Sequence, residues 1–126
     1  MTTNNKATIL LFHGSKDPSW MEPFLALKEK VIEQSPNTRI THAFLQFGAP
    51  TLAEAVYALF TEEIRKFVVI PVFISARGHV AKDVPVLVEK AKKMFPDAEI
   101  TISPAIGELP RVQQAMVESI AAIAKE

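Results

Sequence analysis

Two histidines in this sequence occupy similar places, each in a polar loop that follows a run of apolar residues. His13 comes directly after residues 8–12, and His79 comes shortly after residues 67–74, next to Gly78. Neutral imidazole binds divalent transition metals, and its pKa near neutrality lets it accept or release a proton. A single loop histidine usually hydrogen-bonds within its own loop. A metal or acid–base role therefore depends on whether the fold brings the two side chains together.

Apolar runs and amphipathic stretches alternate along the chain, which predicts strands and helices in turn. The predicted strands are residues 7–12, 39–45, 67–74 and 99–102, and the predicted helices are residues 18–34, 52–60, 84–95 and 110–124. We expect the last helix to turn Val112, Met116 and Ile120 inward. Such alternation is typical of an α/β fold with a parallel sheet and helices on both faces. We expect a single flavodoxin-like domain over residues 1–126, with a four-stranded sheet in the order 2-1-3-4.

Particular residues indicate where two of the helices begin and where a strand should lack a hydrogen bond. Thr51, with Glu54 three residues on, has the pattern of a capping box for the second helix. Asp83 as a cap and Pro85 in the first turn predict that the third helix begins near residue 84. Pro71 has no N–H for a ladder, so we expect a missing bond within the third strand.

The expected strand order would place the two histidines at one crevice. With the first strand beside the third, the chain leaves these strands in opposite directions, and a crevice opens at their carboxyl ends. His13 ends the first strand and His79 follows the third, so both would border this crevice and favour a ligand-binding or acid–base site. The four glycines of the chain also fall in the loops after the predicted strands, at Gly14, Gly48, Gly78 and Gly107.

The composition excludes several classes of partner and site. Lys and Arg together number 14, as do Asp and Glu, so no net charge favours nucleic acid or an anionic membrane. There is no cysteine, which excludes disulfides and thiolate metal sites and is compatible with a cytoplasmic location. The opening residues have too short an apolar run for a signal peptide, and no stretch reaches the ~20 apolar residues of a membrane span. We expect a soluble, cytoplasmic domain.

Other readings of the histidines and loops have less support. His42 lies within the second predicted strand, and we expect it to be structural, because a buried strand histidine usually finds a hydrogen-bond partner. The chain has neither a Walker lysine loop nor a G-x-G-x-x-G sequence. Phe12 precedes His13 where phosphohistidine chemistry would need an arginine, and Ser15 has no nucleophile-elbow sequence around it. A flavodoxin-like phosphate-binding enzyme is the weakest of the hypotheses.

Three stretches of the chain resemble the signature sequences of a known family. The family is the small CbiX/SirB-type sirohydrochlorin chelatases of the class II chelatase group, and the similarity lies in LLFHGSKDP, AFLQFGAPTLAEA and VIPVFISARGHVAKDVPVL. The resemblance implies a chelatase (a lyase) that inserts Co²⁺, Fe²⁺ or Ni²⁺ into sirohydrochlorin in cobalamin- or siroheme-type biosynthesis. It implies a homodimer that builds the cleft, with His13 and His79 as the catalytic and metal-binding residues. The metal is then a substrate, and no organic cofactor is implied.

The residues near the histidines suit the chemistry that the resemblance implies. Metallation requires the ion to lose water, two pyrrole N–H protons to leave, and the ion to be passed on. Imidazole binds such ions with moderate strength and can also accept a proton. Because the substrate carries many carboxylates, cationic side chains nearby are candidate contacts. The implied substrate-binding set is Gly14, Ser15, Lys16, Gln46, Arg77, Gly78 and Lys82.

One residue departs from the family pattern. Where family members typically have glutamate after the AFL segment, this chain has Gln46. An amide oxygen can coordinate an ion, but it has neither the charge nor the basicity of a carboxylate. A second hypothesis therefore stays open, in which the chain binds a tetrapyrrole or a metal with little catalytic power, as a carrier or regulator.

Overall fold

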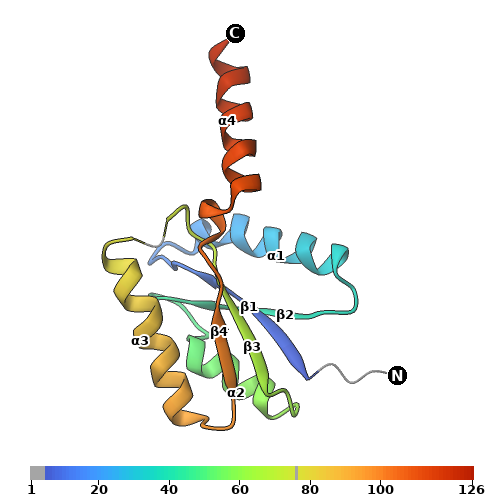
Figure 1. The fold of residues 1–126 in the computed structure, drawn as a ribbon, viewed down its shortest axis with the longest axis vertical. Helices are drawn as coiled ribbons and strands as arrows, with labels where there is room; N and C mark the ends of the chain where they lie inside the picture. Colours follow the sequence, from blue (N-terminus) through green and yellow to red (C-terminus); the bar gives the residue numbers. More distant parts are fainter. Residues whose placement is uncertain (1–4, 76) are drawn as a thin grey trace.

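A parallel sheet of four strands forms the centre of the molecule (Figure 1). The computed structural model describes residues 5–75 and 77–126, apart from the side chains of His79 and Val80. The strands are β1 (Lys6–Phe12), β2 (Arg39–Phe44), β3 (Lys66–Pro71) and β4 (Glu99–Ile102). Their order is β2-β1-β3-β4 and every pair is parallel, which confirms the predicted topology. β1 therefore lies between β2 and β3, and the loops that follow β1 and β3 leave the sheet side by side.

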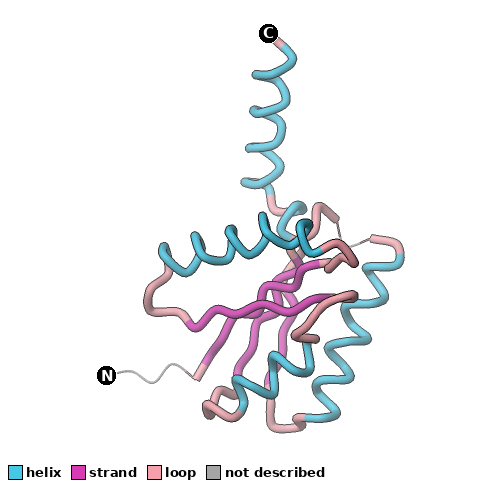
Figure 2. Tube along the Cα trace, turned by 180° about the vertical axis from the view of Figure 1, so that it is seen from behind, coloured by secondary structure: helices cyan, strands magenta, loops and turns pink. Residues whose placement is uncertain are grey.

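Helices cover both faces of this sheet (Figure 2). The helices α2 (Leu52–Phe60) and α3 (His79–Met94) pack on one face, and α1 (Glu22–Gln34), preceded by the 3₁₀ turn η1 (Pro18–Met21), packs on the other. Alternate residues of β1 supply the two cores, so that Ile9 and Leu11 face α2 and α3 while Leu10 and Phe12 face α1. Burial on both faces explains the unbroken apolar run of this strand. In the described part of the chain, no helix has both the length and the apolar character needed to cross a bilayer.

The second helix begins at the predicted capping box. The Thr51 hydroxyl accepts a hydrogen bond from the Glu54 N–H at 3.2 Å, and a Glu54 carboxylate oxygen accepts one from the Thr51 N–H at 2.8 Å. Two N–H groups without helical partners are satisfied in this way. The box also fixes the far end of the loop that follows β2, and this loop carries Gln46.

The third strand is shorter than predicted. β3 ends at Pro71, whereas the apolar pattern predicted a strand to residue 74. Pro71 has no N–H to continue the ladder, and after it only the Val72 N–H still donates to the Leu11 carbonyl, at 2.9 Å. The chain then turns out of the sheet, and the Ile74 side chain is 75% exposed. The apolar residues beyond Pro71 therefore lie in a loop rather than in a strand.

The third helix begins earlier than predicted. α3 starts at His79, directly after Gly78 with its φ of 67°, and the Ala81 N–H donates to the Gly78 carbonyl at 3.2 Å. The prediction of a start near residue 84 is wrong, so Asp83 is not the cap and Pro85 lies inside the helix. A proline there deprives only the carbonyl four residues earlier of its helical partner. That carbonyl belongs to the exposed Ala81, so water can replace the lost bond.

The last helix does not pack on its own sheet. α4 (Pro110–Ala124) follows the 3₁₀ turn η2 (Ile106–Glu108) and rises away from the carboxyl ends of the strands (Figure 1). None of its residues is buried, and Ile120 is 66% exposed. The prediction that Val112, Met116 and Ile120 face this chain's core is therefore wrong. An apolar stripe shows that a helix needs a partner, but it does not show which surface provides it.

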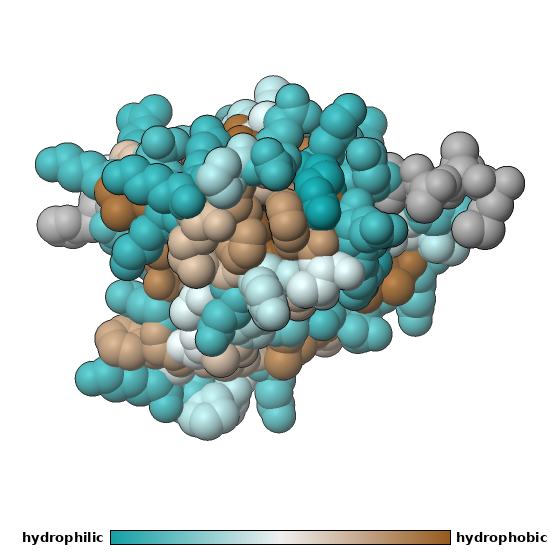
Figure 3. Space-filling view, turned by 90° about the horizontal axis from the view of Figure 1, so that it is seen from below, coloured by the Kyte–Doolittle hydropathy of each residue, from teal (hydrophilic) through white to brown (hydrophobic). Residues whose placement is uncertain are grey.

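The opposite end of the molecule, where the strands begin, is closed by aromatic side chains. The rings of Phe60 and Phe95 lie 5.3 Å apart, and the Arg65 guanidinium lies 3.6 Å from the centre of the Phe60 ring. Arg65 also donates to the Phe60 carbonyl at 2.9 Å. Figure 3, which views the molecule from this end, shows a hydrophobic area surrounded by hydrophilic residues.

His42 has the structural role that its place in a strand predicted. Lys28 Nζ donates to His42 Nδ1 at 3.0 Å, and the imidazole packs edge-on against Phe44, with ring centroids 5.2 Å apart. Burial, and then the neighbouring Lys28 charge, lower the pKa of His42 below its ordinary value. A proton on Nδ1 would also remove the acceptor that Lys28 uses. The neutral ring is therefore the form that packs between α1 and β2.

We expect His42→Ala to lower the free energy of unfolding by about 1–2 kcal/mol at pH 7.5, since a half-buried hydrogen bond and a ring contact are lost. The pH dependence follows from the lowered pKa. Below about pH 6.5 the unfolded chain takes up a proton that the folded chain refuses, so wild-type stability should fall as the pH drops, and the variant should show a smaller fall. Urea unfolding at several pH values measures both effects, and unchanged stability at pH 7.5 would contradict the structural role.

Candidate functional site

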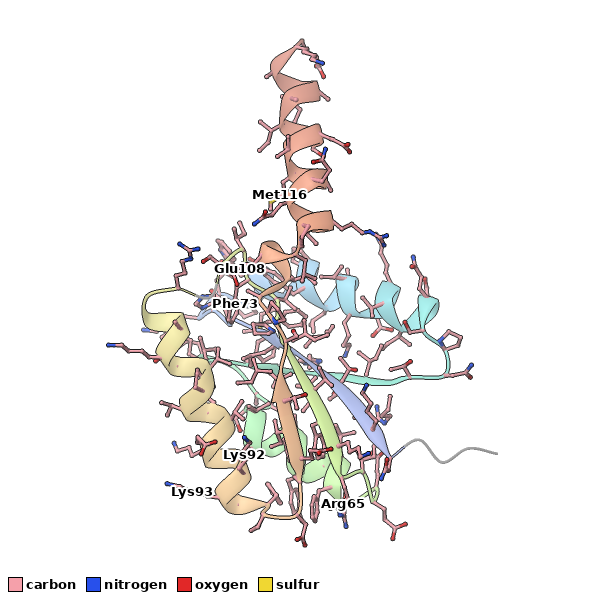
Figure 4. The ribbon with its side chains drawn as sticks, in the orientation of Figure 1. Arg65, Phe73, Lys92, Lys93, Glu108 and Met116 are labelled. Carbon is pink, nitrogen blue, oxygen red and sulfur yellow. The ribbon has the colours of Figure 1, made fainter. Side chains whose placement is uncertain are left out.

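The loops at the carboxyl ends of the strands are joined to one another by backbone hydrogen bonds. The Gln46 N–H donates to the His13 carbonyl at 3.1 Å, which ties the loop after β2 to the loop after β1. The Gly107 N–H donates to the Phe73 carbonyl at 2.9 Å, which ties η2 to the loop after β3 (Figure 4). This end of the sheet is thus a connected surface, as is typical of ligand sites in α/β folds.

Gly14 is required by the close approach of two of these loops. Its φ is 87°, a left-handed value, and a Cβ atom placed there would collide with the backbone oxygen of Gln46. Gly78 also has a left-handed φ, of 67°, but no atom lies within 4 Å of the place its Cβ would take. The two glycines therefore differ in crowding while sharing an unfavourable backbone conformation.

This difference gives a matched pair of variants. Gly78→Ala should cost about 1–2 kcal/mol of stability from backbone strain alone. Gly14→Ala should cost about 2–4 kcal/mol, because the added methyl group must also push the Gln46 backbone away from His13. Thermal and urea unfolding of both variants measure the difference. Equal losses would show that the contact between the two loops is not rigid.

A pocket of about 690 Å³ opens beside His13, between the ends of β1 and β3 and the start of α1. Most of its lining is apolar, and the aromatic part of it is Phe12, Trp20, Phe24, Phe44 and Phe73. The imidazole of His13 is exposed, and its ring lies 4.6 Å from the ring of Phe73. Apolar walls with a few polar groups are typical of a small-molecule binding site. An exposed imidazole at such a wall can reach a ligand that lies in the pocket.

The other residues predicted for the site lie around this pocket or beside it. Gly14 and Ser15 line it, and Gln46 is exposed next to His13, as the strand order predicted. Gly78 directly precedes α3, and Lys82 is exposed on the first turn of that helix. The backbone of His79 begins α3, while its side chain lies outside the described residues. Gly14, Ser15 and Gln46 thus lie beside His13, while Gly78 and Lys82 lie at the start of α3.

Two cationic side chains near the pocket make weak contacts. Lys16 Nζ lies 5.0 Å from the centre of the Phe47 ring, and Arg77 Nε lies 4.0 Å from a Glu108 carboxylate oxygen. The Arg77 side chain is 89% exposed, so this ion pair contributes little to stability. Both cations are therefore free to move toward an anionic ligand at small cost.

Few side chains in the described part of the chain could coordinate a metal ion. No cluster of three or more His, Asp or Glu side chains suited to a metal ion occurs among these residues. Asp17, close to His13 in sequence, is used locally, since it accepts bonds from the Ser19 N–H at 3.0 Å and the Ser19 hydroxyl at 2.8 Å. These bonds lower the pKa of Asp17. Its carboxylate caps η1 rather than facing the pocket.

The aromatic walls of the pocket were not predicted from the sequence. Phe12, Phe24, Phe44 and Phe73 read as core residues because they fall in apolar runs, and three of them do pack in the α1 core. Trp20 offers the only local signal, because it is the single tryptophan of the chain and follows a polar loop. It is 64% exposed at the pocket.

Comparison with known proteins agrees with the motifs. The family model CbiX matches residues 7–123. A sirohydrochlorin cobaltochelatase from Saccharolobus solfataricus is 28% identical over 118 residues, which cover 89% of this chain and 91% of that protein. A sirohydrochlorin cobaltochelatase from Methanococcus aeolicus is 28% identical over 80 residues, covering 64% of this chain and 56% of that protein.

Solved structures show the same fold. A CbiX protein from Marinobacter aquaeolei VT8 has a TM-score of 0.84 and 28% identity, covering 95% of this chain and 98% of that one. The sirohydrochlorin chelatase SirB from Bacillus subtilis subspecies spizizenii, solved with cobalt, has a TM-score of 0.79 at 21% identity and covers 94% of this chain and 51% of that one. At that identity the second likeness concerns the fold alone. Because the family model spans nearly all of the sequence, the chain belongs to the CbiX family.

Proposed function

We propose that this protein is a sirohydrochlorin chelatase that inserts Co²⁺, Fe²⁺ or Ni²⁺ into the macrocycle for cobalamin- or siroheme-type biosynthesis. The observation that carries the proposal is the exposed imidazole of His13 beside a large apolar pocket, in a chain of the CbiX family. Relatives of nearly the same length are named sirohydrochlorin cobaltochelatases, which supports the same reaction here.

In this proposal His13 and His79 bind the incoming ion and take part in removing the pyrrole protons. The reaction replaces two N–H protons of the macrocycle by one M²⁺ ion, so two protons must leave for each ion that enters. An imidazole can release the metal and accept a proton in turn. The role of His13 is supported by its exposure at the pocket, and the role of His79 rests on the GHV motif at the start of α3.

The remaining groups bind the substrate in two ways. The aromatic walls of the pocket pack against the face of the tetrapyrrole, which is mostly apolar. Lys16, Arg77 and Lys82 meet its carboxylates, and Arg77 can do so with two parallel bonds. The backbone and hydroxyl groups of Gly14, Ser15 and Gly78, with the amide of Gln46, complete the substrate-binding set.

The proposal includes a homodimer whose second copy supplies the other wall of the cleft. The pocket of one chain is open, whereas sites usually bury most of a ligand of this size. A two-fold partner offers the same loops from the opposite side. We place the enzyme in the cytoplasm, consistent with a chain without cysteine, and expect no nucleic-acid partner.

The test is direct. Sirohydrochlorin should be mixed with Co²⁺, Fe²⁺ or Ni²⁺ under anaerobic conditions, and the absorbance change that follows metallation recorded with and without the protein. We expect at least one metal to be inserted faster in the presence of protein. Rates equal to the protein-free rate for all three metals would contradict the proposal.

Gln46 favours a second candidate, a tetrapyrrole or metal carrier with little catalysis. The residue is exposed beside His13, where a carboxylate would add negative charge near the metal and an amide does not. Binding to a carrier would change the absorbance of sirohydrochlorin. It would not speed metal insertion. Equilibrium titration without metal, followed by addition of metal, distinguishes the two.

A further inference from the structure

Only part of the pocket lining is open to a ligand. Three of the Phe and Trp residues that line it have no more than 6% of their surface exposed: Phe12, Phe44 and Phe73. Two large apolar side chains of the lining are open to solvent instead, Trp20 at 64% and Ile74 at 75%. Large apolar side chains exposed together at one pocket indicate a contact surface. A molecule that enters the pocket therefore meets Trp20 and Ile74 before it meets the buried rings.

The Trp20 side chain projects from an ordered turn. Its backbone N–H donates to the Asp17 carbonyl at 3.1 Å, and the Asp17 carboxylate accepts bonds from the Ser19 N–H at 3.0 Å and the Ser19 hydroxyl at 2.8 Å. The Asp17 N–H donates to the Ser15 hydroxyl at 3.1 Å, and Pro18 follows in the first position of η1. Asp17 thus joins the loop after β1 to the turn that carries Trp20. A side chain held in this way loses little freedom when a ligand binds.

The Ile74 side chain projects from backbone that is packed against η2. The Gly107 N–H donates to the Phe73 carbonyl at 2.9 Å, and a Cβ atom at Gly107 would collide with the backbone of Ile74. The two segments can approach so closely because glycine has no side chain. Phe73, which Figure 4 labels, is buried directly before Ile74 in the chain. The exposed position of the Ile74 side chain is therefore set by contacts on both sides of its backbone.

We propose that Trp20 and Ile74 hold the face of the tetrapyrrole macrocycle from two different loops, and that Asp17 is a positioning residue for the Trp20 ring. The macrocycle is flat and conjugated, and indole has the largest aromatic face among the side chains, so the two stack with little rearrangement. Ile74 adds an aliphatic contact from the loop after β3. The inference rests on the proposed function for the identity of the ligand, but it concerns binding and not metal insertion.

Titration with metal-free sirohydrochlorin, followed by its absorbance, tests the two contacts. Trp20→Leu should weaken binding about tenfold or more, and Trp20→Phe should weaken it less, because a smaller ring remains. Ile74→Ala should weaken binding about threefold to tenfold, since several buried methyl and methylene groups are lost. Wild-type affinity in Trp20→Leu or in Ile74→Ala would overturn the role of that residue, and a wild type that does not bind the ligand would overturn both.

Tyr57→Leu is the matched control for Trp20→Leu. Tyr57 is 60% exposed, close to the exposure of Trp20, but it belongs to α2 and does not line the pocket. We expect it to bind sirohydrochlorin with wild-type affinity. Sedimentation velocity of the same variants shows whether Trp20 acts in binding or in assembly. Weaker binding by Trp20→Leu that accompanies a change in its oligomeric state would contradict a direct contact with the ligand.

The role of Asp17 is tested through the fluorescence of Trp20, the single tryptophan of the chain. Asp17→Ala should lower the anisotropy of Trp20 emission in the free protein and weaken binding about fivefold, since the bonds from Ser19 are lost. Asp17→Asn keeps an oxygen that accepts these bonds, so it should retain most of the affinity. In the Trp20→Leu protein, Asp17→Ala should cause no further loss. A further loss there, or unchanged anisotropy in Asp17→Ala, would contradict the positioning role.

Metal insertion, measured separately with the same variants, distinguishes this inference from the proposed function. Binding that depends on Trp20 in a protein that inserts no metal would contradict the chelatase and support the contact. Insertion by the wild type, with binding unaffected by Trp20→Leu, would support the chelatase and overturn the contact.

Discussion

Replacement of His13 by alanine should lower the initial rate of metal insertion by about tenfold or more, with little change in stability. The imidazole is exposed beside the pocket and its ring contact is with Phe73, so its removal takes away the proposed metal ligand and proton acceptor while the core stays intact. The initial rate with Co²⁺, followed by absorbance, and the urea midpoint together measure the two effects. His79→Ala should lower the rate to a similar extent, as the sequence motif predicts.

His42→Ala is the control for this prediction, because it changes a histidine of the same molecule that does not itself line the pocket. It should lower the free energy of unfolding through the lost Lys28 and Phe44 contacts, and it should leave the insertion rate of the folded protein nearly unchanged. The opposite pattern, with activity lost in a well-folded His42→Ala protein and retained in His13→Ala, would show that the site is assigned to the wrong histidine.

Gln46→Glu should have the second large effect, in the direction of a gain. Gln46 is exposed and its N–H is bonded to the His13 carbonyl, so a carboxylate there would lie close to a metal held by that histidine. A charge beside a divalent ion attracts far more strongly than an amide dipole, even with solvent screening. The carboxylate can also accept a pyrrole proton, and a positioned base typically contributes ~10²–10⁴-fold. We expect tighter Co²⁺ binding, and faster insertion if the wild type is slow.

The outcomes of this substitution separate the two functional candidates. Binding of Co²⁺ is measured by isothermal titration, and insertion by absorbance with sirohydrochlorin. Faster insertion in the variant would indicate a chelatase whose insertion rate is limited by the Gln46 amide. Rapid wild-type turnover that the substitution lowers would contradict the expected gain and mark Gln46 as adapted to the active site. Binding of tetrapyrrole without insertion in either form would favour the carrier.

The sequence predicted the sheet because the relevant forces are local or follow from handedness. Continuous apolar runs identified the strands, the capping box at Thr51 identified the start of α2, and right-handed connections limited the strand order. The end of β3 and the start of α3 were predicted wrongly, because a proline can either interrupt an element or mark its boundary. Pro71 ended β3 instead of interrupting it, and Pro85 lies inside α3 because its lost bond falls on the exposed Ala81.

The site was predictable only in part, because topology determines which loops meet but not which side chains form the pocket walls. The strand order brings the loops after β1, β2 and β3 to one end, so the neighbourhood of His13 and Gln46 follows from topology. The pocket walls do not follow from topology, because Phe12, Phe24 and Phe44 line the pocket and also pack in the core beside α1. The exposure of α4 was not predictable either, because an apolar stripe shows that a helix needs a partner but not which surface provides it.

The number of insertions completed by each protein molecule tests the central claim most directly. Sirohydrochlorin and Co²⁺ should be supplied in about tenfold excess over protein, and product measured by absorbance until the reaction stops, with the protein-free rate subtracted. If the protein is a chelatase, each molecule should complete several insertions at an initial rate above the protein-free rate. Conversion that stops at or below one insertion for each protein molecule, or proceeds no faster than without protein, would contradict the account.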